Sequence, residues 1–143
     1  MRRSSKPAAG WTSVRPDGRL RDIATVGRVN IGSPASVAAA YFDAWKSNDI
    51  ELVRPLLHED VNFVGALGST QGAEDTLEGL GRMFAMTETV EVVHRWVDGS
   101  DVLTWFELRT ATAGPLAIVN WSQVQAGRIS RIRVTFDPRP LLS

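Results

Sequence analysis

The side chains best placed for chemistry are a carboxylate and a guanidinium two positions apart, Glu107 and Arg109. In a β-strand, such neighbours point to the same face, which they share here with Leu103 and Trp105. A carboxylate beside an apolar wall can have a raised pKa and act as a general acid or base, and the guanidinium can stabilise an oxyanion. We therefore predict both as catalytic residues. The alternative is a structural ion pair, or a face turned toward solvent or a dimer partner.

Three more polar residues are candidates for the same site. His94 is in phase with Val90 and Trp96 on an expected strand, and it can shuttle a proton if that face is turned inward. The alternative is a core or rim histidine with satisfied hydrogen bonds. Asn120 and Ser122 share one face of another strand, where they can orient a carbonyl or hydroxyl group of a ligand. The alternative is that they only form hydrogen bonds in their own neighbourhood.

Aromatic and sulfur-containing side chains are expected to line a pocket for a small, mostly apolar molecule. Five tryptophans are many for a chain of 143 residues, and large rings seldom pack together without gaps. Simple core packing is the alternative, and most of these side chains can do both. Beside Asn120 and Ser122, the predicted ligand-binding residues are Tyr41, Phe42, Trp45, Phe63, Met83, Trp105 and Phe136.

Several kinds of site are not expected. The chain has no cysteine, and its two histidines, His58 and His94, lack the spacing of metal ligands, so no metal is predicted. No glycine-rich phosphate loop precedes a helix, so no nucleotide cofactor is predicted. No apolar run is long enough for a membrane helix, and no secretory signal is apparent, so a cytoplasmic protein without membrane contacts is expected.

The apolar spacing predicts three helices that precede a run of strands. Ser33 and Pro34 are typical of a helix start, and apolar residues follow at helical spacing. Pro55 must shorten the second helix because it removes a backbone donor. The expected elements are a helix from Pro34 to Trp45, a short helix after Asp49, a strand over Val61–Val64, a Gly-Ser-Thr loop, and a helix over Gly72–Met86.

From Thr87 onward the apolar period falls to about two residues, which is typical of strands. Turns at Asp98-Gly99, Gly114-Pro115 and Ala126-Gly127 separate them. The expected strands are Thr89–Val97, Val102–Thr112, Leu116–Gln125 and Arg128–Phe136. The fold class is therefore α+β, with three helices packed on a curved antiparallel sheet that encloses a pocket.

Charge divides the chain. Residues 1–28 carry seven basic and two acidic side chains, whereas the rest of the chain carries nine basic and 14 acidic side chains. We expect residues 1–32 to be a basic, disordered extension and residues 33–143 to be the domain. An arm for nucleic acid or an organelle address is the alternative for the extension, but without interleaved aromatic residues we expect no nucleic-acid binding.

Two arginines on the last expected strand suggest a partner. Arg131 and Arg133 alternate with Ile132 and Val134, so they share the convex face with neighbours such as Trp121. An apolar and basic face of this kind is often paired, and we predict a homodimer through the sheet.

The order of elements resembles the NTF2-like superfamily of cone-shaped domains, in particular its SnoaL-like branch, which includes limonene epoxide hydrolases and polyketide cyclases. Four stretches carry the resemblance: YFDAWKSND at 41–49, HEDVNF at 58–63, GAEDTLEGLGRMF at 72–84 and AGRISRIRVTFD at 126–137. The resemblance implies an NTF2-like cone around a small-molecule pocket.

The epoxide hydrolases use two aspartates around an arginine, with a tyrosine and an asparagine that hold a water. In the alignment by sequence, Glu107 and Arg109 occupy the positions of the arginine and the first aspartate, in reversed order. The other positions hold Val134, Phe63 and Gly65, which cannot replace those groups. Ketosteroid isomerases place their base at the position of Gly65, and polyketide cyclases use an acid near Val134.

Two function classes remain open from the sequence. The first is a cofactor-independent hydrolase, cyclase or isomerase acting on a small apolar epoxide, ketone or polyketide-like substrate, with Glu107 as acid or base. The second is a domain that binds a small ligand, or dimerises, without catalysis. A cavity lined by the Glu107 carboxylate would favour the first.

Overall fold

The computed structural model describes residues 32–142. The predicted basic extension lies outside this range except for Gly32. The domain begins with helix α2 (Pro34–Lys46), which starts where the sequence predicts. The Ser33 side chain caps it by accepting a hydrogen bond from the Ser36 backbone N–H at 3.2 Å.

The region after α2 differs from the expectation. The predicted second helix is instead two short 3₁₀ turns, η2 (Ile50–Leu52) and η3 (Arg54–Leu56), because Pro55 cannot continue an α-helix. Strand β1 (Leu57–Gly65) is longer than Val61–Val64, and the expected Gly-Ser-Thr loop is part of a strand, β2 (Gly68–Gln71), that pairs with it.

The second half confirms the expected elements. Helix α3 (Ala73–Met86) is followed by β3 (Thr87–Asp98), β4 (Asp101–Thr110), β5 (Leu116–Gln125) and β6 (Arg128–Thr135), and a 3₁₀ turn, η4 (Arg139–Leu141), ends the described chain. Strands β3 to β6 form the expected antiparallel meander. The Asp98-Gly99 turn contains a glycine with a φ of +62°, a conformation that favours glycine.

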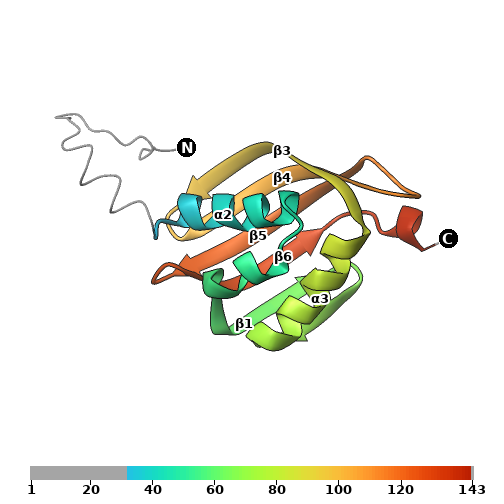
Figure 1. Ribbon diagram of the computed structural model, residues 1–143. Helices are drawn as coiled ribbons and strands as arrows, with labels where there is room; N and C mark the ends of the chain where they lie inside the picture. Colours follow the sequence, from blue (N-terminus) through green and yellow to red (C-terminus); the bar gives the residue numbers. More distant parts are fainter. Residues whose placement is uncertain (1–31, 143) are drawn as a thin grey trace.

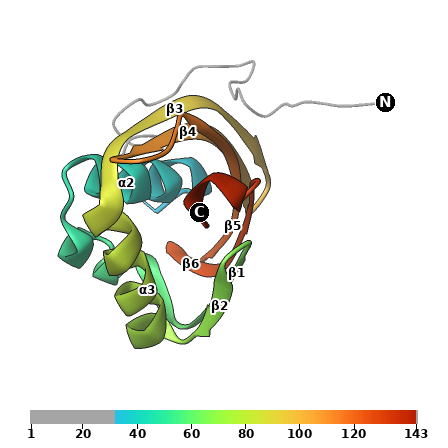
Figure 2. The ribbon, with the colours of Figure 1, turned by 90° about the vertical axis from the view of Figure 1, so that its right-hand side faces the viewer.

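The six strands form one mixed sheet in the order β2-β1-β6-β5-β4-β3. Strand β1 pairs with β6 in parallel orientation, so β1 and β2, which precede α3 in the chain, belong to the same sheet as the meander. The sheet curves without closing, with α2 and α3 on its inner side (Figure 1). In the view of Figure 2, the sheet forms an arc from β3 to β2 around these helices. This is the predicted α+β cone.

Aromatic rings fill the space between α2 and the sheet. Trp45 stacks on Phe84 of α3 with ring centroids 5.3 Å apart, and it also lies 5.2 Å from Phe106 of β4. Phe42 lies edge-on to Phe106 at 4.9 Å. All four rings are buried, so this cluster joins both helices to the sheet and fixes the faces that point inward.

Candidate functional site

The inner face of β4 does not carry the predicted catalytic pair. Val102, Thr104, Phe106, Leu108 and Thr110 are buried, whereas the residues between them are exposed or half-buried. The expectation that Glu107 and Arg109 line the internal pocket is therefore wrong: with Leu103 and Trp105 they lie on the outer face of the sheet. Spacing places the four on one face but does not say which face packs on the core.

A β-bulge moves His94 to the outer face as well. Val92 pairs with Phe106, but the next paired residue, His94, is opposite Trp105, so one extra residue stands between them. From His94 onward, even-numbered residues of β3 face outward, whereas Val90 and Val92 before the bulge face inward. His94 and Trp96 are exposed beside each other, with ring centroids 4.3 Å apart, and the expected inward position of His94 is also wrong.

The same bulge turns Arg95 inward, a residue that the sequence reasoning missed. Its Nε donates a hydrogen bond to the Thr104 hydroxyl at 3.1 Å, and its guanidinium lies 5.5 Å from the centre of the Phe42 ring. Partial burial lowers the pKa of Arg95, and the nearby Asp43 carboxylate opposes this shift. No feature of the sequence predicts the bulge that turns this side chain inward.

Asn120 and Ser122 share one face of β5, as predicted; it is the inner face, and both residues are buried. The Ser122 hydroxyl donates to Asn120 Oδ1 at 2.7 Å, which leaves the amide nitrogen as the free end. Asn120 Nδ2 has no hydrogen-bond partner, although its side chain is buried. Such a group destabilises the fold unless the neighbouring Tyr41 phenol, a water or a ligand satisfies it.

Tyr41 of α2 completes this polar cluster. Burial raises the pKa of its phenol well above the ordinary value of 10.0, and a side-chain interaction with Asn120 opposes that shift, which places the amide beside the phenol. Tyr41 is buried inside the cone, and this interior stabilises the neutral form of its phenol.

The alkaline stability of the protein should report on Tyr41. Because its folded pKa is raised, its contribution to stability is complete below pH 10 and is lost as the pH rises above that value, at up to about 1.4 kcal/mol per pH unit. Tyr41→Phe should remove this part of the decline in urea unfolding measured above pH 10. Tyr41 is the only tyrosine in the sequence, so tyrosinate absorbance is a direct second measurement. Ionisation near pH 10 in the folded protein would contradict the expectation.

The other predicted lining residues divide into three groups. Phe42 and Trp45 are inward but packed in the aromatic cluster, whereas Phe63, Met83 and Phe136 are only partly buried at its margin. Trp105 lies on the outer face and is 43% exposed, so its predicted pocket role is wrong.

An apolar hollow lies between α3 and the β1–β2 hairpin, and we name it the α3 pocket. Its volume is about 490 Å³. The pocket is lined by Phe63, Leu67, Gly68, Ser69, Thr70, Thr76, Gly79, Leu80, Arg82, Met83 and Met86. Apolar groups dominate this lining, which includes Phe63 and Met83 as predicted, and it contains no carboxylate or imidazole.

The α3 pocket adjoins the strands that carry the polar cluster. A Cβ added at Gly65 would meet the Phe63 ring at 2.9 Å and Val134 at 3.7 Å, so these side chains lie together on the inner side of β1 and β6. Val134 pairs with Asn120 across β5 and β6. Phe63 thus lies in the wall of the pocket and close to Val134, the residue that pairs with Asn120.

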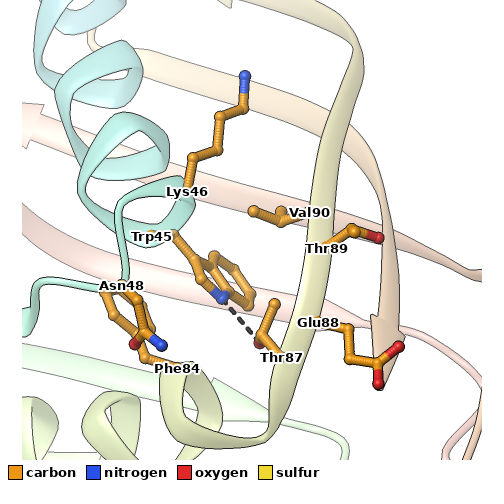
Figure 3. A pocket seen from close by; sticks show the side chains of 8 residues that line it. All are labelled: Trp45, Lys46, Asn48, Phe84, Thr87, Glu88, Thr89 and Val90. Carbon is orange, nitrogen blue, oxygen red and sulfur yellow. Dashed lines mark hydrogen bonds between the residues drawn. The ribbon is translucent and has the colours of Figure 1, made fainter. Parts of the chain in front are cut away.

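A smaller hollow of about 270 Å³ lies where α2, α3 and β3 meet (Figure 3). Trp45 Nε1 points into it and donates to the Thr87 hydroxyl at 2.9 Å. The Lys46 ammonium and the Glu88 carboxylate point away from the indole in Figure 3, so they do not form a charged site over it.

Within residues 32–142, no group of three or more histidine, cysteine, aspartate or glutamate side chains is arranged to hold a metal ion. In the same part of the chain, no helix is both long and apolar enough to cross a membrane.

Known structures share this architecture. An NTF2-like protein from Cytophaga hutchinsonii superposes with a TM-score of 0.70 at 21% identity, covering 78% of this chain and 96% of its own. An LEH-like epoxide hydrolase from M. tuberculosis gives a TM-score of 0.64 at 22% identity, covering 75% and 84%. A steroid delta-isomerase from Pseudomonas aeruginosa gives 0.65 at 21% identity, covering 73% and 80%. At such low identities, these superpositions show a shared fold and nothing about activity.

No curated protein matches the sequence. The SnoaL-like domain family matches residues 38–132, well over half of the chain, from within α2 to within β6. The resemblance predicted from the sequence is thereby confirmed: the chain belongs to the SnoaL-like domain family and has the NTF2-like fold.

Proposed function

We propose that this protein binds a small, mainly apolar molecule in the α3 pocket and does not catalyse acid–base chemistry there. The observation that carries this proposal is an apolar hollow of about 490 Å³ without a carboxylate or imidazole in its lining. A volume of this size is typical of pockets for small molecules, which combine apolar walls with a few polar groups.

A hydrolase, cyclase or isomerase is the second candidate, because solved relatives include an epoxide hydrolase and a steroid isomerase. Such an enzyme needs a proton donor or acceptor within hydrogen-bond reach of its substrate. Glu107 and His94 lie on the opposite face of the sheet, and the inward positions of β4 are held by residues such as Phe106 and Leu108. We therefore place binding ahead of catalysis and assign no catalytic role to Glu107 or Arg109.

The polar cluster suggests the class of ligand. A carbonyl, epoxide or ether oxygen is an acceptor without a donor, and it matches the free Asn120 amide and the adjacent Tyr41 phenol. A ligand that spans the α3 pocket and reaches Asn120 would satisfy that amide. We propose a small cyclic ketone or epoxide as the ligand class, with Phe63 and Met83 against its apolar part.

Native mass spectrometry against a panel of cyclic ketones, epoxides and matching hydrocarbons tests the proposal. We expect one ligand per chain and unchanged ligand mass after incubation. Gly79→Leu should fill the pocket and raise the Kd at least about tenfold, since Gly79 lines it and its added Cβ would lie 3.4 Å from Thr70. Ala85→Leu, an exposed position of α3 outside the pocket, is the matched control.

Equal binding by Gly79→Leu would remove the α3 pocket from consideration. Hydration or isomerisation of a panel member by the wild-type protein, lost in Gly79→Leu, would favour the catalytic candidate instead.

We also propose a homodimer through the outer face of the sheet. Trp96, Trp105 and Trp121 are 48%, 43% and 37% exposed on this face, more aromatic surface than a free sheet normally presents. Sedimentation velocity of the wild-type protein should show a dimer at micromolar concentration.

A further inference from the structure

The α3 pocket has one charged side chain in its lining, Arg82. The rest of the lining consists of apolar residues and hydroxyl groups, so no carboxylate of the pocket wall competes for the guanidinium. Leu67 and Met86 also line the pocket and are 48% and 40% exposed, so they form an apolar rim where it opens to solvent. Because Arg82 is exposed as well, its charge lies at this opening and not in the apolar interior.

The guanidinium of Arg82 lies beside a position of α3 that has no side chain. A Cβ added at Gly79 would lie 4.0 Å from Arg82 Nη2 and 3.4 Å from Thr70 Cγ2 on β2. Both are ordinary contact distances, so an alanine would fit at this position. Glycine in the middle of a helix is less stable than alanine. The glycine keeps open the space between Arg82 and Thr70, and Nη2 of the guanidinium borders that space.

The guanidinium has a donor available for a ligand. Arg82 Nη1 lies 3.5 Å from Glu78 Oε2, and both side chains are exposed. An exposed ion pair one helical turn apart is weak, because water screens the two charges and solvates each of them when the pair opens. Nη2 has no hydrogen-bond partner among residues 32–142. A ligand carboxylate can therefore bind Nη2 beside Glu78, or replace Glu78 at little cost in free energy.

Two hydroxyl groups of the same lining supply a further donor. Thr70 Oγ1 and Thr76 Oγ1 are 2.7 Å apart, so one of them donates a hydrogen bond to the other. Two hydroxyls carry two hydrogens, and this bond uses only one of them. The second hydrogen has no acceptor in the described part of the chain, so it is available to an oxygen of a ligand. The pocket thus offers a positive charge and a hydroxyl donor to a negatively charged, oxygen-bearing group.

We propose that the ligand of the α3 pocket carries one carboxylate, which Arg82 binds at the opening while Phe63 and Met83 contact the apolar part. This inference rests on the binding function proposed above and adds the charge of the ligand. A carboxylate matches because a guanidinium presents two parallel N–H groups to its two oxygens, and one cation compensates one negative charge. A phosphate monoester, with about two negative charges, would leave one of them uncompensated.

Titration calorimetry of the full-length protein with two probes that share one apolar cage tests this inference. The probes are adamantane-1-carboxylate, which is charged at neutral pH, and 2-adamantanone, which is neutral. For the carboxylate, Arg82→Gln should raise the Kd about tenfold, because a charge-assisted hydrogen bond is lost. Glu78→Gln removes the competing carboxylate and should lower that Kd about twofold. Neither substitution should change the Kd of 2-adamantanone, which has no charge to pair with Arg82.

Arg128→Gln, the same change at an exposed position of β6 outside the pocket, is the matched control and should leave both Kd values unchanged. Arg82→Lys keeps the charge without the two parallel donors, so its carboxylate Kd should lie between those of the wild type and Arg82→Gln. An unchanged carboxylate Kd in Arg82→Gln, or a wild type that binds only the ketone, would overturn this inference and leave the α3 pocket in place. A wild type that binds neither probe, or carboxylate binding that is unchanged in Gly79→Leu, would overturn the pocket itself.

Discussion

Replacing Trp45 by alanine is expected to lower the free energy of unfolding by about 3–5 kcal/mol, the usual cost of removing a large buried aromatic side chain. The indole stacks on Phe84 at 5.3 Å and lies against Phe106 at 5.2 Å, so its loss opens a cavity between both helices and the sheet. Trp45 Nε1 also donates to the Thr87 hydroxyl at 2.9 Å. Urea unfolding followed by circular dichroism measures the change.

Two further variants separate packing from hydrogen bonding. Trp45→Phe keeps a ring in the cluster and should lose clearly less stability, which also provides a folded protein if Trp45→Ala does not fold. Thr87→Val removes the acceptor, together with the hydrogen bond that the Thr87 hydroxyl donates to the Met83 carbonyl at 2.7 Å, and should cost about 1–2 kcal/mol. An equal loss in Trp45→Ala and Thr87→Val would show that the aromatic cluster is not what stabilises this junction.

The double substitution Asn120→Leu with Ser122→Ala is expected to stabilise the ligand-free protein by about 1–3 kcal/mol. It removes the buried Nδ2 group that has no partner, and it removes both ends of the Ser122–Asn120 hydrogen bond together. Either single substitution should be less stable than the double variant, because it leaves the other polar group buried alone. Thermal unfolding of the four proteins gives this comparison.

The same double variant should bind less tightly to a cyclic ketone than the wild type does, while its affinity for the matching hydrocarbon stays the same. Native mass spectrometry with the two ligands measures this difference. A gain in stability without any change in ketone affinity would mean that Asn120 does not contact the ligand. A loss of stability would mean that the amide is already satisfied in the folded protein, by the Tyr41 phenol beside it or by a buried water.

Local patterns predicted much of the fold. The Ser33-Pro34 start of α2, the apolar stripe of α3 and the hairpin turns at Asp98-Gly99 and Ala126-Gly127 depend on a few adjacent residues, and all of them are confirmed. Strand β2 was missed because Gly68–Gln71 has no apolar alternation. It is a strand because β1 supplies its hydrogen-bond partners.

The candidate site was predicted in part. Asn120, Ser122, Tyr41, Phe63 and Met83 are where the sequence places them, inside the cone or at its pocket. Glu107, Arg109, His94 and Trp105 are not. Glu107, Arg109 and Trp105 do share one face, as their spacing predicts. Because apolar residues occupy both faces of β3 and β4, the hydrophobic pattern does not indicate which face packs on the core.

The sequence by itself therefore determined which elements form, where they turn, and which side chains share a face, because these properties follow from backbone preferences over a few residues. Only the tertiary structure decided which face is inside. The aromatic cluster of Phe42, Trp45 and Phe84 takes Phe106 as its neighbour on β4, which directs Glu107 and Arg109 outward. The bulge before His94 then turns His94 outward and Arg95 inward. Such a one-residue shift in strand pairing depends on contacts between distant parts of the chain.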